Sequence, residues 1–157
     1  MAESKDEHFM RAAIDEAKKA LDKQEVPIGA VVVCNDIIIA RAHNLTETLN
    51  DPTAHAEMQA ITAAAGWLGG KYLADCTIYV TIEPCAMCAG AIGWSQAGRL
   101  VYGSGDPKKG YTLVKGALLH PKTAVTAGIL AKECGEMVSE FFKSKRQVYP
   151  PPPLKGG

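Results

Sequence analysis

The chain has 157 residues, of which 22% are charged and 47% hydrophobic, the proportions of an ordinary folded domain. No apolar run approaches the roughly 20 residues that a membrane-spanning helix needs, and the polar first residues lack the apolar segment of a secretory signal. A membrane protein is therefore not expected, and the expected location is the cytoplasm. The five cysteines, two of them in a C-x-x-C motif, favour metal binding in a reducing compartment over a disulfide framework.

The formal net charge is zero, but the charges are unevenly distributed along the chain. Residues 1–98 hold 7 Lys/Arg and 13 Asp/Glu, a net charge of −6, whereas residues 99–157 hold 10 Lys/Arg and 4 Asp/Glu, a net charge of +6. A basic half is typical of proteins that bind nucleic acid or another anionic partner. The alternative is that the two halves interleave in the fold and their charges pair.

The hydrophobic pattern predicts helices and strands that alternate along the chain. The first helix is expected over residues 5–24, followed by a hairpin of strands at residues 30–34 and 37–42. The remaining elements are helices at residues 54–65, 85–94, 112–119 and 129–147, and strands at residues 76–80, 99–102 and 123–126. This alternation indicates an α/β domain with helices on both faces of a sheet. Residues 1–149 are expected to form this one domain and residues 150–157 a loose tail.

His55, Cys85 and Cys88 form a set of three metal ligands. The two cysteines are three residues apart, so both sulfurs lie on one face of the helix that they begin and can reach one ion. A structural zinc ion usually has four protein ligands, whereas a catalytic one keeps a position open for water. Because no fourth ligand lies at motif spacing, the sequence predicts one catalytic Zn²⁺. The alternative is half of a structural zinc ribbon.

Glu57 is the predicted catalytic group, because it lies two residues after His55 at the entrance of a helix. A bound zinc ion lowers the pKa of a water molecule, and a carboxylate beside it can carry the proton from that water to the substrate. Attack on an amidine-like carbon with loss of ammonia is the reaction of such a group of residues on an aminated heterocycle. The pattern H-x-E…P-C-x-x-C is the signature of zinc nucleobase deaminases.

His55-Ala56-Glu57 and Pro84-Cys85-Ala86-Met87-Cys88 resemble the motifs of the cytidine deaminase superfamily. Within it, three runs resemble bacterial tRNA-specific adenosine deaminases, over a similarity that spans residues 7–146: Glu25-Val26-Pro27-Ile28-Gly29-Ala30-Val31, Asp51-Pro52-Thr53-Ala54-His55-Ala56-Glu57 and Glu83-Pro84-Cys85-Ala86-Met87-Cys88-Ala89-Gly90-Ala91. The resemblance implies a three-layer α/β/α fold with a central mixed sheet of about five strands. It also implies conversion of the wobble adenosine of an arginine tRNA to inosine, and a homodimer with Trp94 as a candidate interface residue; the alternative for Trp94 is core packing.

The resemblance further implies which residues contact the tRNA anticodon stem-loop. The pocket for the base is expected to be lined by the backbone regions of Ala56 and Cys85, with Val26, Ile28 and Asn44 nearby. Asp106 matches the aspartate of a loop that lies along the RNA backbone. An aromatic and basic C-terminal segment matches the part of the family that meets the anticodon loop: Phe142, Lys143 and Arg146. After Gly110 the chain departs from the family's usual pattern and is shorter.

Two other functions use the same motifs. The first is deamination of a free base such as guanine or cytosine, since guanine deaminases also carry the Asp-Pro-Thr-Ala-His-Ala-Glu run. The second is a non-catalytic RNA-binding subunit in which zinc is purely structural. The basic end of the chain argues against the first, and Glu57 argues against the second, because a structural site has no use for a carboxylate there.

Overall fold

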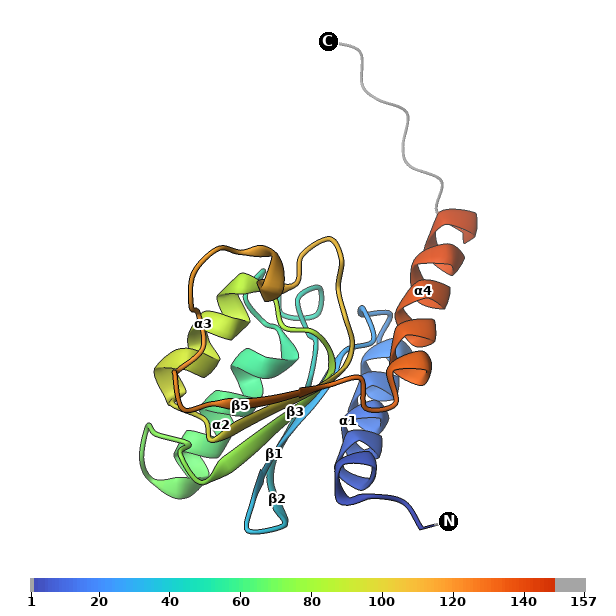
Figure 1. Ribbon diagram of the computed structural model, residues 1–157. Helices are drawn as coiled ribbons and strands as arrows, with labels where there is room; N and C mark the ends of the chain where they lie inside the picture. Colours follow the sequence, from blue (N-terminus) through green and yellow to red (C-terminus); the bar gives the residue numbers. More distant parts are fainter. Residues whose placement is uncertain (1, 149–157) are drawn as a thin grey trace.

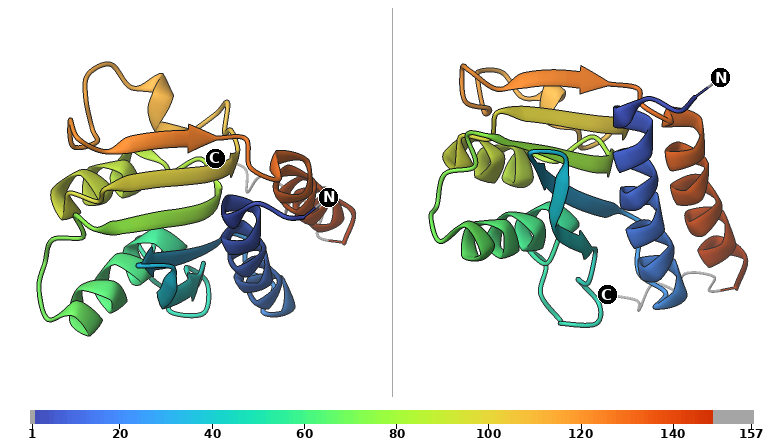
Figure 2. Two further views of the ribbon diagram at one scale, coloured as in Figure 1. Left: turned by 60° about the horizontal axis from the view of Figure 1, so that its bottom comes forward. Right: turned by 90° about the horizontal axis from the view of Figure 1, so that it is seen from below.

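The structure is a computed structural model and describes residues 2–148. A five-stranded sheet lies between two layers of helices, with α1 and α4 on one face and α2 and α3 on the other (Figure 1). Figure 2 shows the same layers from two further directions. The helices are α1 (Lys5–Asp22), α2 (Ala56–Leu68), α3 (Ala86–Ser95) and α4 (Ala131–Val148). The predicted three-layer α/β/α fold is confirmed.

The sheet is mixed, as predicted, with strand order β2-β1-β3-β4-β5. Its strands are β1 (Gly29–Cys34), β2 (Ile37–His43), β3 (Cys76–Ile82), β4 (Arg99–Ser104) and β5 (Ala124–Ala127). β1 pairs antiparallel with β2 and with β3, whereas β3, β4 and β5 pair in parallel. The predicted Asn35-Asp36 turn joins β1 to β2 with φ angles of 52° and 61°, a left-handed conformation that Asn and Asp tolerate. Parallel strands need a crossover, and α3 supplies it between β3 and β4.

Small residues let the helices approach the sheet closely. Ala56, Ala60 and Ala64 of α2 are fully buried against one face of the sheet. On the other face, a Cβ atom at Gly29 would overlap the backbone of Ala13 and Ala17 in α1. The layers are therefore fixed at a spacing that any larger side chain at these positions would disturb.

The predicted helix over residues 112–119 is wrong. The structure has only a short 3-10 helix there, η1 (Tyr111–Leu113), and irregular chain beyond it. The first backbone N–H groups of the segment bond to distant acceptors, from Tyr111 to the Pro84 carbonyl and from Thr112 to the Glu83 carboxylate. Gly116 then adopts a left-handed φ of 97°. Val114 is already extended, with φ −89° and ψ 132°, so the chain leaves the helical conformation after three residues.

Other differences concern the ends of elements. α2 begins at Ala56 rather than at residue 54 and continues through Gly66 to Leu68, where Gly69 ends it with a left-handed φ of 71°. The predicted tail at residues 150–157 lies outside the described residues. Within residues 2–148, none of the helices combines the length and apolar character of a membrane span.

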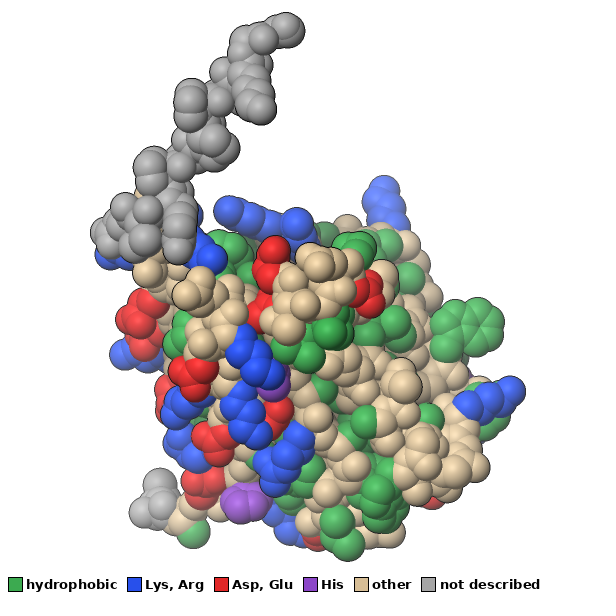
Figure 3. Space-filling model, turned by 180° about the vertical axis from the view of Figure 1, so that it is seen from behind, with side chains coloured by type: hydrophobic (Ala, Val, Ile, Leu, Met, Phe, Trp, Pro, Cys, Tyr) green, Lys and Arg blue, Asp and Glu red, His purple; other side chains and the backbone are tan. Residues whose placement is uncertain are grey.

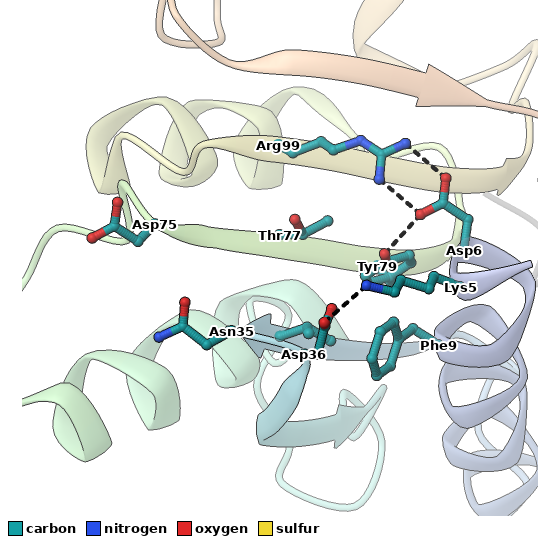
Figure 4. Close-up of a pocket in the computed structure, with 10 residues that line it drawn as sticks. Lys5, Asp6, Phe9, Asn35, Asp36, Asp75, Thr77, Tyr79 and Arg99 are labelled. Atoms are coloured by element: carbon teal, nitrogen blue, oxygen red, sulfur yellow. Dashed lines mark hydrogen bonds and ion pairs between the residues drawn. The ribbon is translucent and has the colours of Figure 1, made fainter.

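A polar groove of about 250 Å³ lies on the α1 face, where β3 and β4 begin (Figure 4). The Arg99 guanidinium donates to both carboxylate oxygens of Asp6 at 2.7 Å, and the Tyr79 hydroxyl donates to the same carboxylate at 2.8 Å. Lys5 pairs with Asp36 across the mouth of the groove at 2.9 Å. These charged side chains pair with one another, and the Asp6 contacts link α1 to β3 and β4.

Candidate zinc site

The three predicted ligands meet where β3 ends and α2 and α3 begin. His55 is the N-cap residue of α2, with φ −72° and ψ 154°, and Cys85 is the N-cap residue of α3, with φ −72° and ψ 174°. Cys88 follows as the third residue of α3. The first turns of two helices therefore flank the cluster, and their unpaired N–H groups and dipoles favour thiolates there.

The spacing of the ligand atoms fits a zinc ion. His55 Nδ1 lies 3.6 Å from Cys85 Sγ and 3.4 Å from Cys88 Sγ. The three ligand atoms all lie within 4.8 Å of one another. Tetrahedral zinc, with Zn–S near 2.3 Å and Zn–N near 2.0 Å, separates its ligand atoms by about 3.5 Å. The His55 ring also hydrogen-bonds the Pro52 carbonyl, the kind of outer contact that orients a ligating histidine.

Protons are unevenly shared within this cluster. Hydrogen bonds from Cys88 and His55 lower the pKa of Cys85 to about 3. The hydrogen bond between Cys88 and Cys85 raises the pKa of Cys88, and the hydrogen bond between His55 and Cys85 raises the pKa of His55. The cluster is thus arranged to favour a thiolate at Cys85, between two hydrogen-bond donors. A cation would replace those protons, because bound cysteine is a thiolate and bound histidine is neutral.

Glu57 lies beside the cluster but outside the ligand set. It is the second residue of α2 and its side chain is buried, with 4% of the residue exposed. Burial raises the pKa of Glu57, the neighbouring Cys85 adds to that rise, and His55 opposes it. A buried carboxylate next to a three-ligand cluster has the position of a proton carrier.

The residues predicted at the base pocket are also brought together. The Asn44 side chain is buried, donates to the Val26 carbonyl at 3.4 Å and accepts from the Thr46 N–H at 3.3 Å. The Asn44 N–H donates to the Ile28 carbonyl at 3.0 Å. Ala56 is fully buried directly after His55, whereas Val26 and Ile28 are half-buried.

The residues predicted to contact RNA lie on other elements. Asp106 is in the loop after β4, where its Oδ1 accepts the N–H groups of Lys108 and Lys109 at 3.0 Å each. α4 begins near the end of β4, with Cys134 against Gly103, and runs on beyond that edge of the sheet (Figure 1). The exposed aromatic and basic residues predicted to meet the anticodon loop lie toward its C-terminal end: Phe142, Lys143 and Arg146.

Sequence reasoning missed two buried carboxylates next to the site, Glu25 and Glu83. They are 0% and 7% exposed, and each accepts backbone N–H groups from a neighbouring loop. The signal that the sequence offers is their place, since each is the first residue of a run that carries the family resemblance and stands one or two residues before a proline. Their partners, however, lie more than 20 residues away along the chain.

Residues 3–104 match the family model described as the cytidine and deoxycytidylate deaminase zinc-binding region. The chain belongs to this family of zinc deaminases. Its curated relatives include the tRNA-specific adenosine deaminase of Bacillus subtilis (strain 168), which is 48% identical over 149 residues and 92% of each chain. The enzyme of the same name from Agrobacterium fabrum is 42% identical over 144 residues, 88% of this chain and 95% of that one.

Solved structures agree with this placement. One, from biochemical and structural studies of A-to-I editing by tRNA:A34 deaminases at the wobble position, superposes with a TM-score of 0.77. It is 42% identical and covers 83% of this chain and 98% of its own. A guanine deaminase from Bacillus subtilis superposes with a TM-score of 0.62 at 29% identity, covering 95% of this chain and 98% of its own.

Proposed function

We propose that this protein is a tRNA adenosine deaminase, which hydrolyses the wobble adenosine of an arginine tRNA anticodon to inosine and ammonia. One observation carries the proposal: a His/Cys/Cys cluster of zinc geometry with a buried glutamate beside it, in a chain 48% identical to a tRNA-specific adenosine deaminase. Residues 1–149 act as one deaminase domain, and the protein works in the cytoplasm.

His55, Cys85 and Cys88 hold the zinc ion, which when bound lowers the pKa of a water molecule towards neutrality. The Glu57 carboxylate accepts the proton of the attacking water and delivers it to a ring nitrogen of adenine. The water oxygen bonds to C6, Glu57 moves the remaining proton of that oxygen to the C6 amino group, and the amino group leaves as ammonia. Water is added, ammonia is lost, and Glu57 ends in the ionisation state in which it began.

The base is extruded from the anticodon loop into the pocket beside the cluster. Val26 and Ile28 supply apolar walls, Asn44 supplies polar contacts to the nucleotide, and Ala56 lies at the floor. The buried position of the Asn44 side chain supports this role, because its bonds to the backbone fix its orientation before substrate binds.

The RNA backbone and the neighbouring bases contact the loop after β4 and the end of α4. Asp106 holds that loop in a turn that presents the exposed Lys108 and Lys109. Phe142, 45% exposed, offers a ring for stacking, and Lys143 and Arg146 offer positive charge to phosphates.

The protein acts as a homodimer through the face of α3. Trp94 on α3 is 87% exposed, and the exposed Leu113 and Val114 belong to the segment that packs over α3 at Gly93. An exposed tryptophan with other apolar side chains is typical of an interface.

The test is deamination by the zinc-loaded protein of an anticodon stem-loop with adenosine at the wobble position. We expect inosine from the wild-type protein, and a loss of turnover of about 1,000-fold in Glu57→Gln with zinc content and circular dichroism unchanged. A wild-type protein that forms no inosine contradicts the proposed function. An active Glu57→Gln variant contradicts the proton-transfer role.

A further inference from the structure

Glu83 connects the zinc site to the loop at residues 105–112. It directly precedes Pro84 and Cys85, so its backbone belongs to the turn that presents a zinc ligand. Its Oε1 accepts the N–H of Asp106 at 3.0 Å. Its Oε2 accepts both the N–H of Thr112 at 3.1 Å and the hydroxyl of Thr112 at 2.8 Å. One carboxylate therefore holds both ends of the loop.

The loop lies directly on this carboxylate. Gly110 is buried and forms an isolated bridge with Cys85, and a Cβ atom at Gly110 would overlap the Glu83 carboxylate. The N–H of Tyr111 donates to the Pro84 carbonyl at 2.9 Å. The Glu83 carboxylate and these backbone contacts together join the loop to the turn that presents Cys85.

Glu25 makes a similar set of contacts in the segment that leads into β1. It directly precedes Val26, and its two oxygens accept the N–H groups of Glu47 at 3.0 Å and Thr48 at 2.7 Å. Burial works to raise the pKa of Glu25, but the hydrogen bonds from Thr48 and Glu47 outweigh it and hold the pKa below its ordinary value. The segment that Glu25 holds begins with Asn44.

We propose that Glu25 and Glu83 are positioning residues, which fix the Asn44 segment and the Asp106 loop on two sides of the zinc site before RNA binds. Neither side chain needs to touch the substrate. An anionic acceptor suits this role, because charge-assisted hydrogen bonds to backbone N–H groups are stronger than neutral ones. Two loops fixed in advance reduce the entropy lost on binding. The inference rests on the proposed function for the identity of the substrate, whereas the loop contacts are taken from the structure.

The kinetic test uses Glu83→Gln and Glu25→Gln, in which an amide NH₂ replaces one acceptor and faces an N–H donor. We expect KM for the anticodon stem-loop to rise about 10-fold, with kcat per bound zinc within about 2-fold of wild type. The matched control is Glu133→Gln, a carboxylate whose side chain is 51% exposed and which pairs with Arg11. The control is expected to leave both constants unchanged. A fall in kcat at unchanged KM is the result of a merely structural role and overturns the proposal.

Amide hydrogen exchange supplies a readout that does not need activity. In Glu83→Gln the amides of Asp106 and Thr112 are expected to exchange about 10-fold faster, with those of Glu47 and Thr48 unchanged, and Glu25→Gln is expected to show the reverse. Unchanged or uniformly faster exchange contradicts the assignment.

Gly110→Ala tests the same loop if Glu83→Gln does not fold. It leaves the Glu83 carboxylate in place but displaces the loop from it, so the same rise in KM is expected, and an unchanged KM contradicts the proposal. If the wild-type protein does not deaminate the stem-loop, the proposed function fails, whereas the exchange pattern still tests the loop contacts.

Discussion

His55 and Cys85 occupy the N-cap positions of α2 and α3, but neither side chain makes a capping hydrogen bond. Ser, Thr, Asp and Asn are preferred at this position because their side chains accept a backbone N–H of the first turn. At the start of both helices, the N-cap side chain lies among the metal ligands instead of capping the first turn. We therefore expect the two missing caps to lower the stability of the metal-free protein.

This balance predicts opposite effects of Cys85→Ser in the two metal states. In chelator-treated protein, serine can cap α3, so we expect the free energy of unfolding to rise by about 0.5–1 kcal/mol. In zinc-loaded protein the same change removes a ligand, so zinc content and stability both fall relative to wild type. Urea unfolding with and without chelator measures both effects. If the variant is less stable than wild type in chelator as well, the contacts of Cys85 stabilise the metal-free fold, and the explanation by a missing helix cap is wrong.

α1 is the element whose start is most fully specified by local sequence. Ser4 is the N-cap residue, its hydroxyl accepts the N–H of Glu7 at 3.1 Å, and the Glu7 carboxylate accepts the N–H of Ser4 at 3.3 Å. This reciprocal capping box satisfies two donors that the helix cannot satisfy itself.

Ser4→Ala is therefore expected to lower the free energy of unfolding by about 1 kcal/mol without changing kcat or KM, since α1 lies on the face of the sheet away from the zinc ligands. Urea unfolding and the stem-loop assay measure the two quantities. Ser139→Ala, an exposed position within α4, serves as the control and should change stability by less than about 0.5 kcal/mol. An equal loss in both variants would contradict the capping role.

Elements with a strong local signal were predictable from sequence, and those that depend on distant partners were not. The apolar periodicity of α1 and α4 and the β-branched runs of β1 and β2 are confirmed to within two residues at each end. The predicted helix at residues 112–119 is wrong because the chain becomes extended at Val114 and left-handed at Gly116, after a start that is bonded to Glu83 and Pro84, far back in the chain. At the site, the spacing of His55, Cys85 and Cys88 predicted the metal cluster. The contacts of Glu25 and Glu83 could not be predicted in this way, because their partner loops are distant in sequence and reach these carboxylates only in the fold.

At the scale of the whole molecule, the acidic and basic halves of the chain partly interleave. Arg99 pairs with Asp6 at 2.7 Å and Arg11 with Glu133 at 3.3 Å, each joining one half to the other. Figure 3 shows charged side chains of both signs gathered on the side formed by α1 and α4, with mainly uncharged surface elsewhere in that view. Lys143 and Arg146 nevertheless remain exposed, which leaves basic surface for RNA.

The Asp6–Arg99 pair joins two layers and predicts a pH dependence of stability. The hydrogen bonds from Arg99 are the main reason that the pKa of Asp6 lies below its ordinary value, against the opposing effect of burial. A lowered carboxyl pKa stabilises the fold above the unfolded pKa of about 3.9, and this stabilisation is lost as the pH falls through the folded pKa.

In chelator-treated protein, Asp6→Asn is therefore expected to reduce the free energy of unfolding by about 1 kcal/mol at pH 7. The difference from wild type should shrink as the pH falls below about 3.9, because the wild-type Asp6 then becomes protonated. Urea unfolding at both ends of this range measures it. A difference that is constant with pH would show that the ionised carboxylate is not the stabilising group.

The proposed dimer predicts the effect of Trp94→Glu. A charge in an apolar interface is costly, so the variant should sediment as a monomer where the wild type sediments as a dimer. Exposed Trp67 in α2, 64% exposed, offers a matched control, and Trp67→Glu should leave the dimer intact. A wild-type protein that is monomeric throughout, or a Trp94→Glu dimer, would contradict the interface on α3.

The most direct test of the central claim is the ratio of kcat/KM for two substrates of the same zinc-loaded protein. One is an arginine tRNA anticodon stem-loop with adenosine at the wobble position, and the other is free guanine, with cytosine, adenine and cytidine assayed beside it. We predict inosine in the stem-loop and no measurable ammonia from the free bases or the nucleoside. Ammonia from guanine with an unchanged stem-loop would contradict the account and make the protein a free-base deaminase.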